Sequence, residues 1–387
     1  MPFISGPDGD LKTAFVSDAW LIDQFVGNTL FTWGLGTSGQ LGDNTIVSKS
    51  IPTQTITVGN NWKQVDTDTN FVSAIKTDGT LWCWGQNTLG QIGDNTITSK
   101  SSPVQTVAFG NNWKQVCCGS SSSIGAIKTD GTLWCWGNNG GGQLGDNTVT
   151  ARSSPVQTVA FSNNWKQVSC GQFHASAIKT DGTLWCWGNN NGGQLGDNTV
   201  TARSSPVQTV AFGNNWKQVS CRQSFTAAIK TDGTLWMWGA NAAGQLGDNT
   251  TISRSSPVQT IAFGTTWKQV GLGDSISACV KTDGTLWMWG SAANGSLGDN
   301  STTNKSSPVQ TISYGTNWKQ ASAGSAFAAG IKTDGSLWIW GVNNSGQLAS
   351  NSSTQVSSPI QTFAGGFSWK QVKCGSSTGT AVTNGDL

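Results

Sequence analysis

Hydrophobic and polar residues alternate along the chain in short runs, and these runs recur in a fixed order. Residues 165–170 and 175–179 alternate in the manner of half-buried β-strands. Asp181-Gly182 follows, a dipeptide that favours a tight hairpin because glycine accepts the positive φ such turns require. Residues 184–187 predict a third strand, and residues 204–210 predict an outer strand in which Pro206 is tolerated. One unit of the chain therefore predicts four short strands joined by turns.

The unit recurs at intervals of 51 or 52 residues, and seven copies account for nearly the whole chain. A period near 50 with several short strands per unit is typical of a β-propeller. Of the 21 Trp, 20 fall on repeat positions, which predicts core packing rather than photochemistry. Two short sequence motifs define the repeat. The Trp-Lys-Gln triplet begins at Trp62, Trp113, Trp165, Trp216, Trp267, Trp318 and Trp369, and the Trp-Gly pair at Trp33, Trp84, Trp136, Trp187, Trp238, Trp289 and Trp340.

The two ends of the repeat region complement each other. Residues 383–387 are a degraded copy of the hairpin that precedes a third strand, and residues 28–34 supply the strand that should follow. Pairing of these strands would close the ring and remove an open edge that invites aggregation. The sequence therefore predicts an all-β, seven-bladed propeller over residues 27–387, preceded by an arm over residues 1–26.

Residues 187–196 resemble the W-G-x-N-x-x-G-Q-L-G signature of RCC1-type repeats, and residues 171–174 and 180–182 resemble two further elements of that family. The resemblance covers residues 27–387 and implies the seven-bladed fold. It implies function only broadly, because the family includes an exchange factor for a small GTPase, an ultraviolet receptor and an enzyme inhibitor. No unit carries an insertion comparable to the wedge of the exchange factor, since unit lengths vary by one residue only.

Composition narrows the chemistry. All 20 acidic residues are Asp, there is one His, and the net charge is +2. Catalysis by paired Glu and relays of two His are excluded, and a strongly basic nucleic-acid binder is disfavoured. No nucleophile stands in a known motif with a base, and no phosphate-binding loop is present. We predict a non-enzymatic protein without a cofactor, and we expect no nucleic-acid partner.

Three sets of repeated residues were weighed as sites. Cys exchanges with small or apolar residues between units, which favours core thiols over a metal site. Asp43 and its equivalents precede Asn-Thr or Asn-Ser, which favours a side-chain-capped turn over a calcium loop. The repeated Lys predict a solvated rim. We therefore predict no metal site.

The segment after the innermost strand differs most between units. Such loops should gather on one face around the channel, and loops on a rigid scaffold often carry binding residues. An aromatic residue beside polar ones suits a protein contact, although drift in loops outside the core would give the same variation. The candidate binding residues are Phe71, Phe173, His174, Arg222, Phe225, Asp274 and Phe327.

The arm, residues 1–26, lies outside the repeat and is apolar enough to need burial. It either packs on the propeller or docks into a neighbouring subunit, and docking is the interpretation we favour at this stage. The candidate anchor residues are Phe15, Trp20, Leu21 and Phe25. The start of the chain has no basic and apolar pattern of a secretory signal, and no run is long enough to span a membrane, so we expect synthesis in the cytoplasm and no membrane partner.

The leading hypothesis is a structural or protein-interaction module that binds protein partners in a larger assembly. Low charge, absent Glu and near-identical repeats resemble surface components of particles such as phage virions. Two alternatives remain: a regulatory binder of a small GTPase, as the family resemblance allows, and a propeller that binds surface glycans through Trp and Asn-rich loops.

Overall fold

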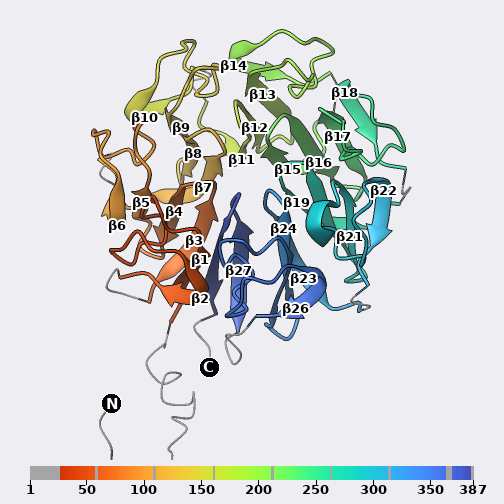
Figure 1. Ribbon diagram of the computed structural model, residues 1–387. Coiled ribbons are helices and arrows are strands. Elements are labelled where there is room, and N and C mark those ends of the chain that lie inside the picture. The colour runs from red at the N-terminus through yellow and green to blue at the C-terminus, as the bar shows by residue number, and fades with distance from the viewer. Residues whose placement is uncertain are drawn as a thin grey trace, which may run out of the picture.

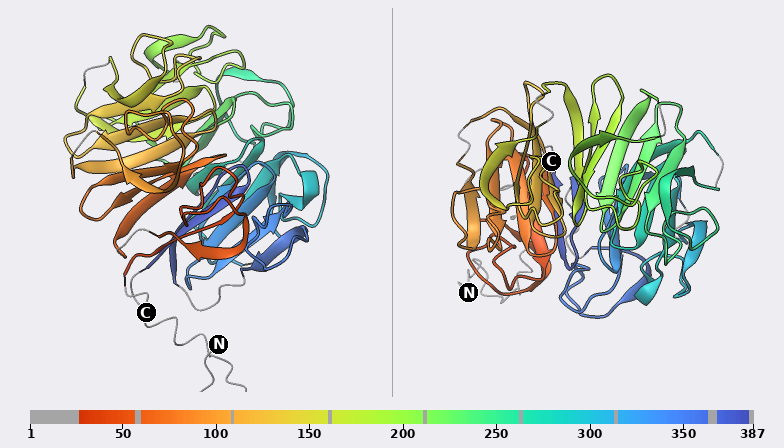
Figure 2. Two further views of the ribbon diagram at one scale, coloured as in Figure 1. Left: turned by 60° about the vertical axis from the view of Figure 1, so that its left-hand side comes forward. Right: turned by 90° about the horizontal axis from the view of Figure 1, so that it is seen from above.

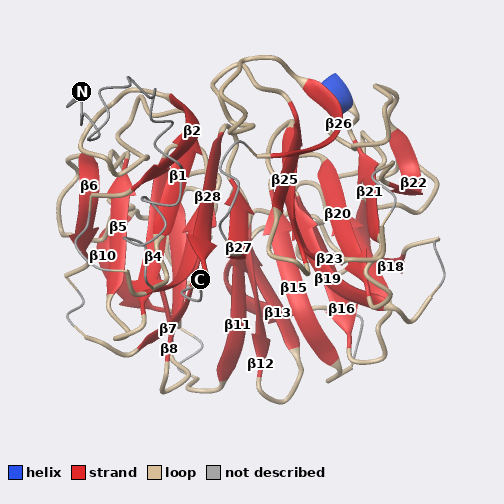
Figure 3. Cartoon of the chain, turned by 90° about the horizontal axis from the view of Figure 1, so that it is seen from below, coloured by secondary structure: helices blue, strands red, loops and turns tan. Residues whose placement is uncertain are grey.

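The computed structural model describes residues 27–56, 60–107, 110–159, 162–210, 213–261, 264–312, 315–362 and 368–384. Seven four-stranded antiparallel sheets stand around a central channel like blades (Figure 1). Figure 2 shows the propeller turned obliquely and, on the right, from above the view of Figure 1, and Figure 3 shows that the described chain is almost entirely strand and loop. The exception is a short 3-10 helix, η1 (Ala293–Gly295). Within the described residues, no helix is long and apolar enough to cross a membrane.

The strands of each blade follow one another outward from the channel. The innermost strands are β3 (Trp62–Thr67), β7 (Trp113–Gly119), β11 (Trp165–Cys170), β15 (Trp216–Arg222), β19 (Trp267–Leu272), β23 (Trp318–Ala323) and β27 (Trp369–Cys374). The second strands are β4 (Phe71–Lys76), β8 (Ser123–Lys128), β12 (His174–Lys179), β16 (Phe225–Lys230), β20 (Ile276–Lys281), β24 (Phe327–Lys332) and β28 (Thr378–Thr383).

The third strands carry the Trp-Gly pair, and the outermost strands carry the proline. The third strands are β1 (Leu30–Gly34), β5 (Leu81–Gly85), β9 (Leu133–Gly137), β13 (Leu184–Gly188), β17 (Leu235–Gly239), β21 (Leu286–Gly290) and β25 (Leu337–Gly341). The outermost strands are β2 (Lys49–Gln54), β6 (Lys100–Gln105), β10 (Arg152–Gln157), β14 (Arg203–Gln208), β18 (Arg254–Gln259), β22 (Lys305–Gln310) and β26 (Val356–Gln361).

The ring closes through the two ends of the chain, as predicted. One sheet has the order β2-β1-β28-β27, and its register runs from Leu30 opposite Val382 to Gly34 opposite Thr378. The backbone N–H of Thr29 also donates to Oγ1 of Thr383 at 2.9 Å. The last blade therefore combines strands from both termini, and its pairing leaves no gap between first and last blade.

Tryptophan fills the space between blades. Trp84 of β5 is fully buried, lies 6.1 Å from Trp62 between ring centroids, and donates from Nε1 to the backbone oxygen of Gln40 in the preceding blade at 2.9 Å. Gly42 lies against the same indole: a Cβ there would come within 2.7 Å of Trp84 Nε1, and its φ is +67°. The same Trp-to-backbone bond joins each blade to the one before it. The burial of the Trp that begin the Trp-Lys-Gln triplets and the Trp-Gly pairs confirms their prediction as core residues, whereas Trp82 and its equivalents are only half-buried.

The disc has two faces, one at each end of the channel. The loop face carries the connections from each innermost strand to the second strand, such as residues 68–70, and the starts of the long loops after Gly34 and its equivalents, since the Leu35 N–H donates to the oxygen of Ser377. The lysine face is the opposite end, where each innermost strand begins and where the Asp-Gly hairpins lie.

Candidate functional site

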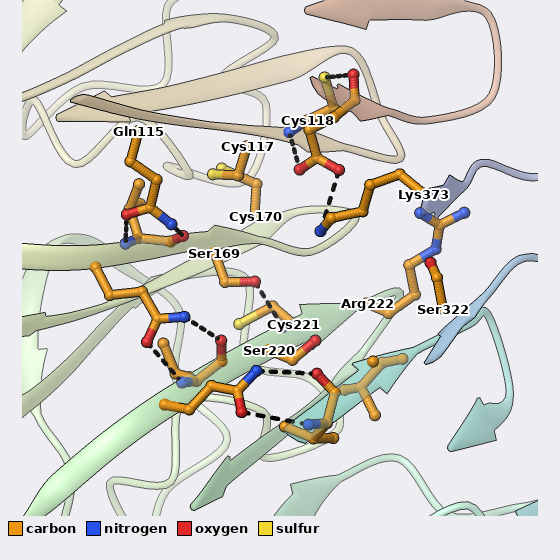
Figure 4. A pocket seen from close by; sticks show the side chains of 18 of the residues that line it. Gln115, Cys117, Cys118, Ser169, Cys170, Ser220, Cys221, Arg222, Ser322 and Lys373 are labelled. Carbon is orange, nitrogen blue, oxygen red and sulfur yellow. Dashed lines mark hydrogen bonds and ion pairs between the residues drawn. The ribbon is translucent and has the colours of Figure 1, made fainter. Parts of the chain in front are cut away.

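A belt of glutamines lines the channel and locks the innermost strands together. Gln167 donates from Nε2 to the backbone oxygen of Val219 at 3.2 Å and accepts from its N–H at 3.0 Å. Every blade makes the same reciprocal pair with the next, so the belt runs around the whole ring, as Figure 4 shows in part. The belt members are Gln64, Gln115, Gln167, Gln218, Gln269, Gln320 and Gln371.

An ion cluster spans the channel mouth on the loop face. Arg222, at the end of β15, donates from Nη1 to Asp68 at 2.8 Å and from Nε to Asp274 at 2.9 Å. Asp274 belongs to the adjacent blade, whereas Asp68 follows β3, so Arg222 bridges the ring from one side to the other. Arg222 and Asp68 are 5% and 0% exposed, which makes the cluster a buried part of the structure.

Burial governs the ionisation of this cluster. Burial raises the pKa of Asp68 to about 6, although the charge of Arg222 acts in the opposite direction. For Arg222, burial lowers the pKa, but the nearby Asp68 and Asp274 outweigh it and raise the pKa of the guanidinium. The arginine therefore stays charged, and Asp68 is the member that titrates near neutral pH.

Below this mouth the channel encloses a cavity of about 270 Å³ lined by the glutamine belt, by Lys373 and Asp66, and by thiols. Lys373 Nζ lies 3.3 Å from Asp66, whose other oxygen accepts from the N–H of Cys118 at 3.1 Å. Asp66 raises the pKa of Lys373. The cavity is therefore polar and its charged groups are already paired.

The nine cysteines are all buried and unpaired by disulfides, in agreement with the core assignment. Cys117 and Cys170 do meet at a blade junction. Cys117 stands at a place that three other blades fill with serine; in one of them, Ser169 Oγ accepts from the backbone N–H of Cys221 in the next blade at 2.8 Å. Sequence comparison treated only equivalent positions and missed the contact between Cys117 and Cys170. Burial raises the pKa of Cys117, so the thiol is protonated at neutral pH. In the described part of the chain, no three His, Cys or Asp side chains are grouped to hold a metal.

The candidate binding residues separate into two groups. Arg222 and Asp274 are brought together at the channel mouth, whereas Phe173 is half-buried and its Cβ lies against Gly141 in the long loop of the preceding blade. Phe71, Phe225 and Phe327 are each at most 1% exposed and pack in the core between blades. These three are the first residues of β4, β16 and β24, so their side chains face the inter-blade core instead of lying in a loop. The prediction that these three side chains contact a partner at the surface is therefore corrected: they are core residues.

His174 is also buried. Its Nε2 lies 3.0 Å from Oγ1 of Thr226 in the next blade, and burial lowers its pKa to about 4. The neutral ring therefore joins two blades and is not open to a partner. The anchor residues Phe15, Trp20, Leu21 and Phe25 lie outside the described residues.

Asp68 is the site residue that the candidate set lacked, and the sequence does contain a signal for it. The slot after each innermost strand holds glycine in five units and opposite charges in the other two. Glycine is needed there because the blades approach closely: a Cβ on Gly375 would meet the oxygen of Asp68 at 2.2 Å. Two charged exceptions of opposite sign in one slot indicate a pair. The slot holds Asp68, Gly119, Gly171, Arg222, Gly273, Gly324 and Gly375.

The Asp43-type residues form turns at the outer rim of the loop face. In one of them, Asp146 Oδ1 accepts from the N–H and hydroxyl of Thr148 at 3.1 and 2.6 Å, and Oδ2 pairs with Arg152 at 2.9 Å. Burial raises the pKa of Asp146, but these donors more than compensate and lower it. The carboxylate oxygens are thus used inside the turn, as the predicted side-chain-capped turn requires. Each of six blades has such a pair.

Aliphatic side chains project from the same rim turns. They occupy the same place, or the next one, in five consecutive blades, and each is between 61% and 67% exposed. The two remaining blades have Thr302 and Ser353 at this place. We call the set the rim aliphatics: Ile46, Ile97, Val149, Val200 and Ile252.

On the lysine face, two kinds of lysine differ. In six blades a lysine lies between two indoles; Lys179 Nζ is 5.0 Å from the Trp165 ring and 4.4 Å from the Trp185 ring. The other kind is the lysine of each Trp-Lys-Gln triplet, which we call the ring lysines: Lys63, Lys114, Lys166, Lys217, Lys268, Lys319 and Lys370. Six are exposed and Lys370 is half-exposed, and among the described residues none has an ion pair.

These features define a closed seven-bladed propeller that offers two faces for binding and, within the described residues, shows no assembled catalytic group. The chain belongs to the RCC1-like domain family, whose match covers residues 25–311, and RCC1 repeats also match residues 318–347 and 334–382.

Several relatives share the repeats across most of the chain. The RCC1 domain-containing protein RUG3 of Arabidopsis thaliana is 28% identical, covering 81% of this chain and 77% of its own. The ultraviolet-B receptor UVR8 of the same plant is 27% identical, covering 86% and 77%. The human E3 ubiquitin-protein ligase HERC2 is 26% identical over 92% of this chain but only 8% of its own length.

Solved structures share the fold. Human WBSCR16 superimposes with a TM-score of 0.83 at 20% identity, covering 93% of this chain and all of that one. Prp20p of Saccharomyces cerevisiae, described with its binding to Gsp1p and histones, gives 0.82 at 18% identity, covering 92% and 91%. At these identities the likeness shows the fold alone.

Proposed function

We propose that this protein is a non-enzymatic interaction module whose protein partner binds along the outer rim of the loop face. The rim aliphatics carry the proposal. Exposed apolar side chains scattered singly need no explanation, but here they recur at one place in five consecutive blades. A partner that follows the rim would meet one such contact per blade, so that weak contacts add up.

The glutamine belt and the buried ion cluster support this function in a different way. They hold the blades in fixed positions, so the rim turns are presented on a rigid scaffold and little conformational entropy is lost on binding. The relatives described for their partners, Prp20p with Gsp1p and histones, make protein binding a familiar use of this fold. The particle-appendage hypothesis has no support among these relatives, and neither does glycan binding, so the proposal stops at a protein partner.

A rim variant tests the proposal. Ile46→Thr, Ile97→Thr, Val149→Thr, Val200→Thr and Ile252→Thr together give all seven blades a polar rim like that at Thr302. The matched control changes neighbouring exposed threonines, with Thr98→Ser, Thr150→Ser and Thr201→Ser.

Photo-cross-linking from positions 97 and 149 in the native host identifies a partner, which is then purified and titrated against each variant. We expect the rim variant to weaken the dissociation constant at least tenfold, about 1.4 kcal/mol or more, while the control stays within twofold. Equal affinity of the rim variant and the native chain would contradict the proposal. The same partner, if it were a small GTPase, would reveal itself by faster nucleotide release, which tests the regulatory alternative directly.

A further inference from the structure

The ring lysines surround the channel mouth on the lysine face. Each is the second residue of an innermost strand and precedes a belt glutamine, so the seven cations must encircle the mouth as the glutamines encircle the cavity. Neighbouring innermost strands are joined by the belt bonds, which places the lysines of adjacent blades side by side. The result is a closed ring of positive charge at one end of the channel.

This ring accounts for the charge of the described structure. The described residues carry 21 basic and 15 acidic side chains, a net charge of +6. The rim turns are neutral pairs, the lysines between indoles are matched by the hairpin Asp residues such as Asp181, and the channel cluster has one excess carboxylate. The excess positive charge of the described chain therefore lies on the ring lysines, with no internal counter-charge.

Comparison of the seven units shows that the ring lysine is kept although no packing or hydrogen-bonding role for it is seen in the described residues. The Trp-Lys-Gln triplet is identical in every unit. Its Trp is buried between blades and its Gln forms the belt, which explains why both are kept. The Lys contributes to neither, yet it never varies while the nearby slot holding Thr67, Cys118 and Leu272 varies freely. A residue repeated without an internal role fits a ligand outside the propeller.

The chain itself contains an acidic segment that precedes the first described residue, Gly27. Residues 1–26 contain four Asp and one Lys, a side-chain charge of −3, and lie outside the described residues. They join the propeller at Gly27, next to the ring: Asn28 pairs with Asn61, and its oxygen accepts from the Trp62 N–H at 3.0 Å, one residue before Lys63. Twenty-six residues can extend over roughly 85 Å, far more than the channel mouth requires.

We propose that the ring lysines are the docking surface for the acidic N-terminal arm of the same chain. Ion pairs at an exposed surface are individually weak and are screened by salt. The tether compensates, because a short linker holds the arm at an effective concentration in the millimolar range. The arm is therefore bound reversibly, and salt releases it. This inference does not rest on the proposed function, which concerns the opposite face.

Lysine acetylation measures the docking on the full chain. The variant Asp8→Asn, Asp10→Asn, Asp18→Asn and Asp23→Asn removes the arm's negative charge and changes no strand. Both chains are treated with a limiting amount of an acetylating succinimidyl ester, and peptide mass spectrometry gives the rate at each lysine. The internal controls are Lys49, Lys100 and Lys305, which pair with Asp on the loop-face rim.

At about 10 mM salt we expect the ring lysines to react about three- to tenfold faster in the variant, with the controls unchanged. At about 1 M salt, where the screening length falls to about 3 Å, the difference should vanish. Equal rates at low salt would overturn the proposal. So would protection that grows with protein concentration, since it would come from the arm of another copy, as in anchoring to an assembly.

A reciprocal experiment reads the arm instead of the ring. Lys12 is the trypsin site within the arm, and its cleavage rate reports access to the protease. Lys63→Gln, Lys166→Gln and Lys268→Gln should speed this cleavage about threefold or more, whereas Lys49→Gln, Lys100→Gln and Lys305→Gln should not. Unchanged cleavage in the ring variant would refute the docking. Added inorganic polyphosphate that protects the ring equally in the native chain and the Asp→Asn variant would show the ring open to outside polyanions, which also overturns it.

Discussion

The two mouths of the channel differ in how their charged side chains are accommodated: one buries them in ion pairs, and the other leaves them exposed. On the loop face, Arg222 is buried and shares its guanidinium between Asp68 and Asp274. On the lysine face, seven cations stand in or near solvent, and among the residues that the structure describes none of them has an ion pair. Taking a charge out of water is costly unless a partner of opposite charge compensates. The buried Arg222 therefore requires its two carboxylates, whereas exposed lysines at the other mouth can be repeated in every blade without such partners.

The two mouths also differ in whether their residues follow the sevenfold repeat. The buried cluster breaks the sevenfold symmetry, because two glycine slots have become Asp68 and Arg222, and it fixes those blades across the ring. The ring lysines keep the symmetry and add charge without fixing anything. The buried ion pairs and the exposed positive charge therefore lie at different ends of the channel, and substitutions should separate their effects.

The largest expected effect is at the loop-face mouth. Arg222→Ala leaves Asp68 buried without its cation, and we expect the free energy of unfolding in urea at pH 7 to fall by about 3–5 kcal/mol. The control at the other mouth, Lys268→Ala, should change it by no more than about 0.5 kcal/mol. A loss below about 1 kcal/mol for Arg222→Ala would show that the two mouths are energetically alike.

The same cluster should make stability depend on pH. The pKa of Asp68 is about 6 in the folded chain against the ordinary 3.8, so between these values the native state binds the extra proton. Stability is then greatest below the unfolded pKa and decreases as pH rises towards 6, by up to about 3 kcal/mol from this group. Asp68→Asn should flatten the melting temperature between pH 4.5 and 7. Parallel pH profiles of the native chain and Asp68→Asn would contradict the assignment.

A smaller effect is expected between the two mouths, in the glutamine belt. Gln167→Ala removes the donor and acceptor that serve the backbone of Val219, and should cost about 1–3 kcal/mol. Hydrogen exchange at the Val219 amide should speed up accordingly. Lys166→Ala, one residue away on the same strand, is the matched control and should leave that exchange rate unchanged; equal exchange in both variants would argue against the belt as a lock.

The fold was largely readable from the sequence because each prediction used local patterns repeated seven times: the strands, the Asp turns, the buried Trp and the closure of β1 on β28. The site was less readable, because it depends on which residues meet across the ring. The pairing of Asp68 with Arg222 requires two loops on opposite sides, and Cys117 meets Cys170 only through the stagger of adjacent blades. Phe71 was misplaced for a simpler reason, since it is the first residue of β4 and not the last residue of the preceding loop.

The smallest expected effect sharpens the comparison most, because it concerns residues that the fold does not use. Lys63→Gln, Lys166→Gln and Lys268→Gln should each change the free energy of unfolding by less than about 0.5 kcal/mol, since exposed lysines without ion pairs contribute little to stability. A modest gain is expected at low salt, because neighbouring cations in the ring repel one another, and it should disappear as salt screens them. Urea titrations at two salt concentrations measure both the change in the free energy of unfolding and its dependence on salt. A loss above about 1 kcal/mol for any one substitution would mean that the ring is structural after all, and its persistence through seven units would then need no ligand.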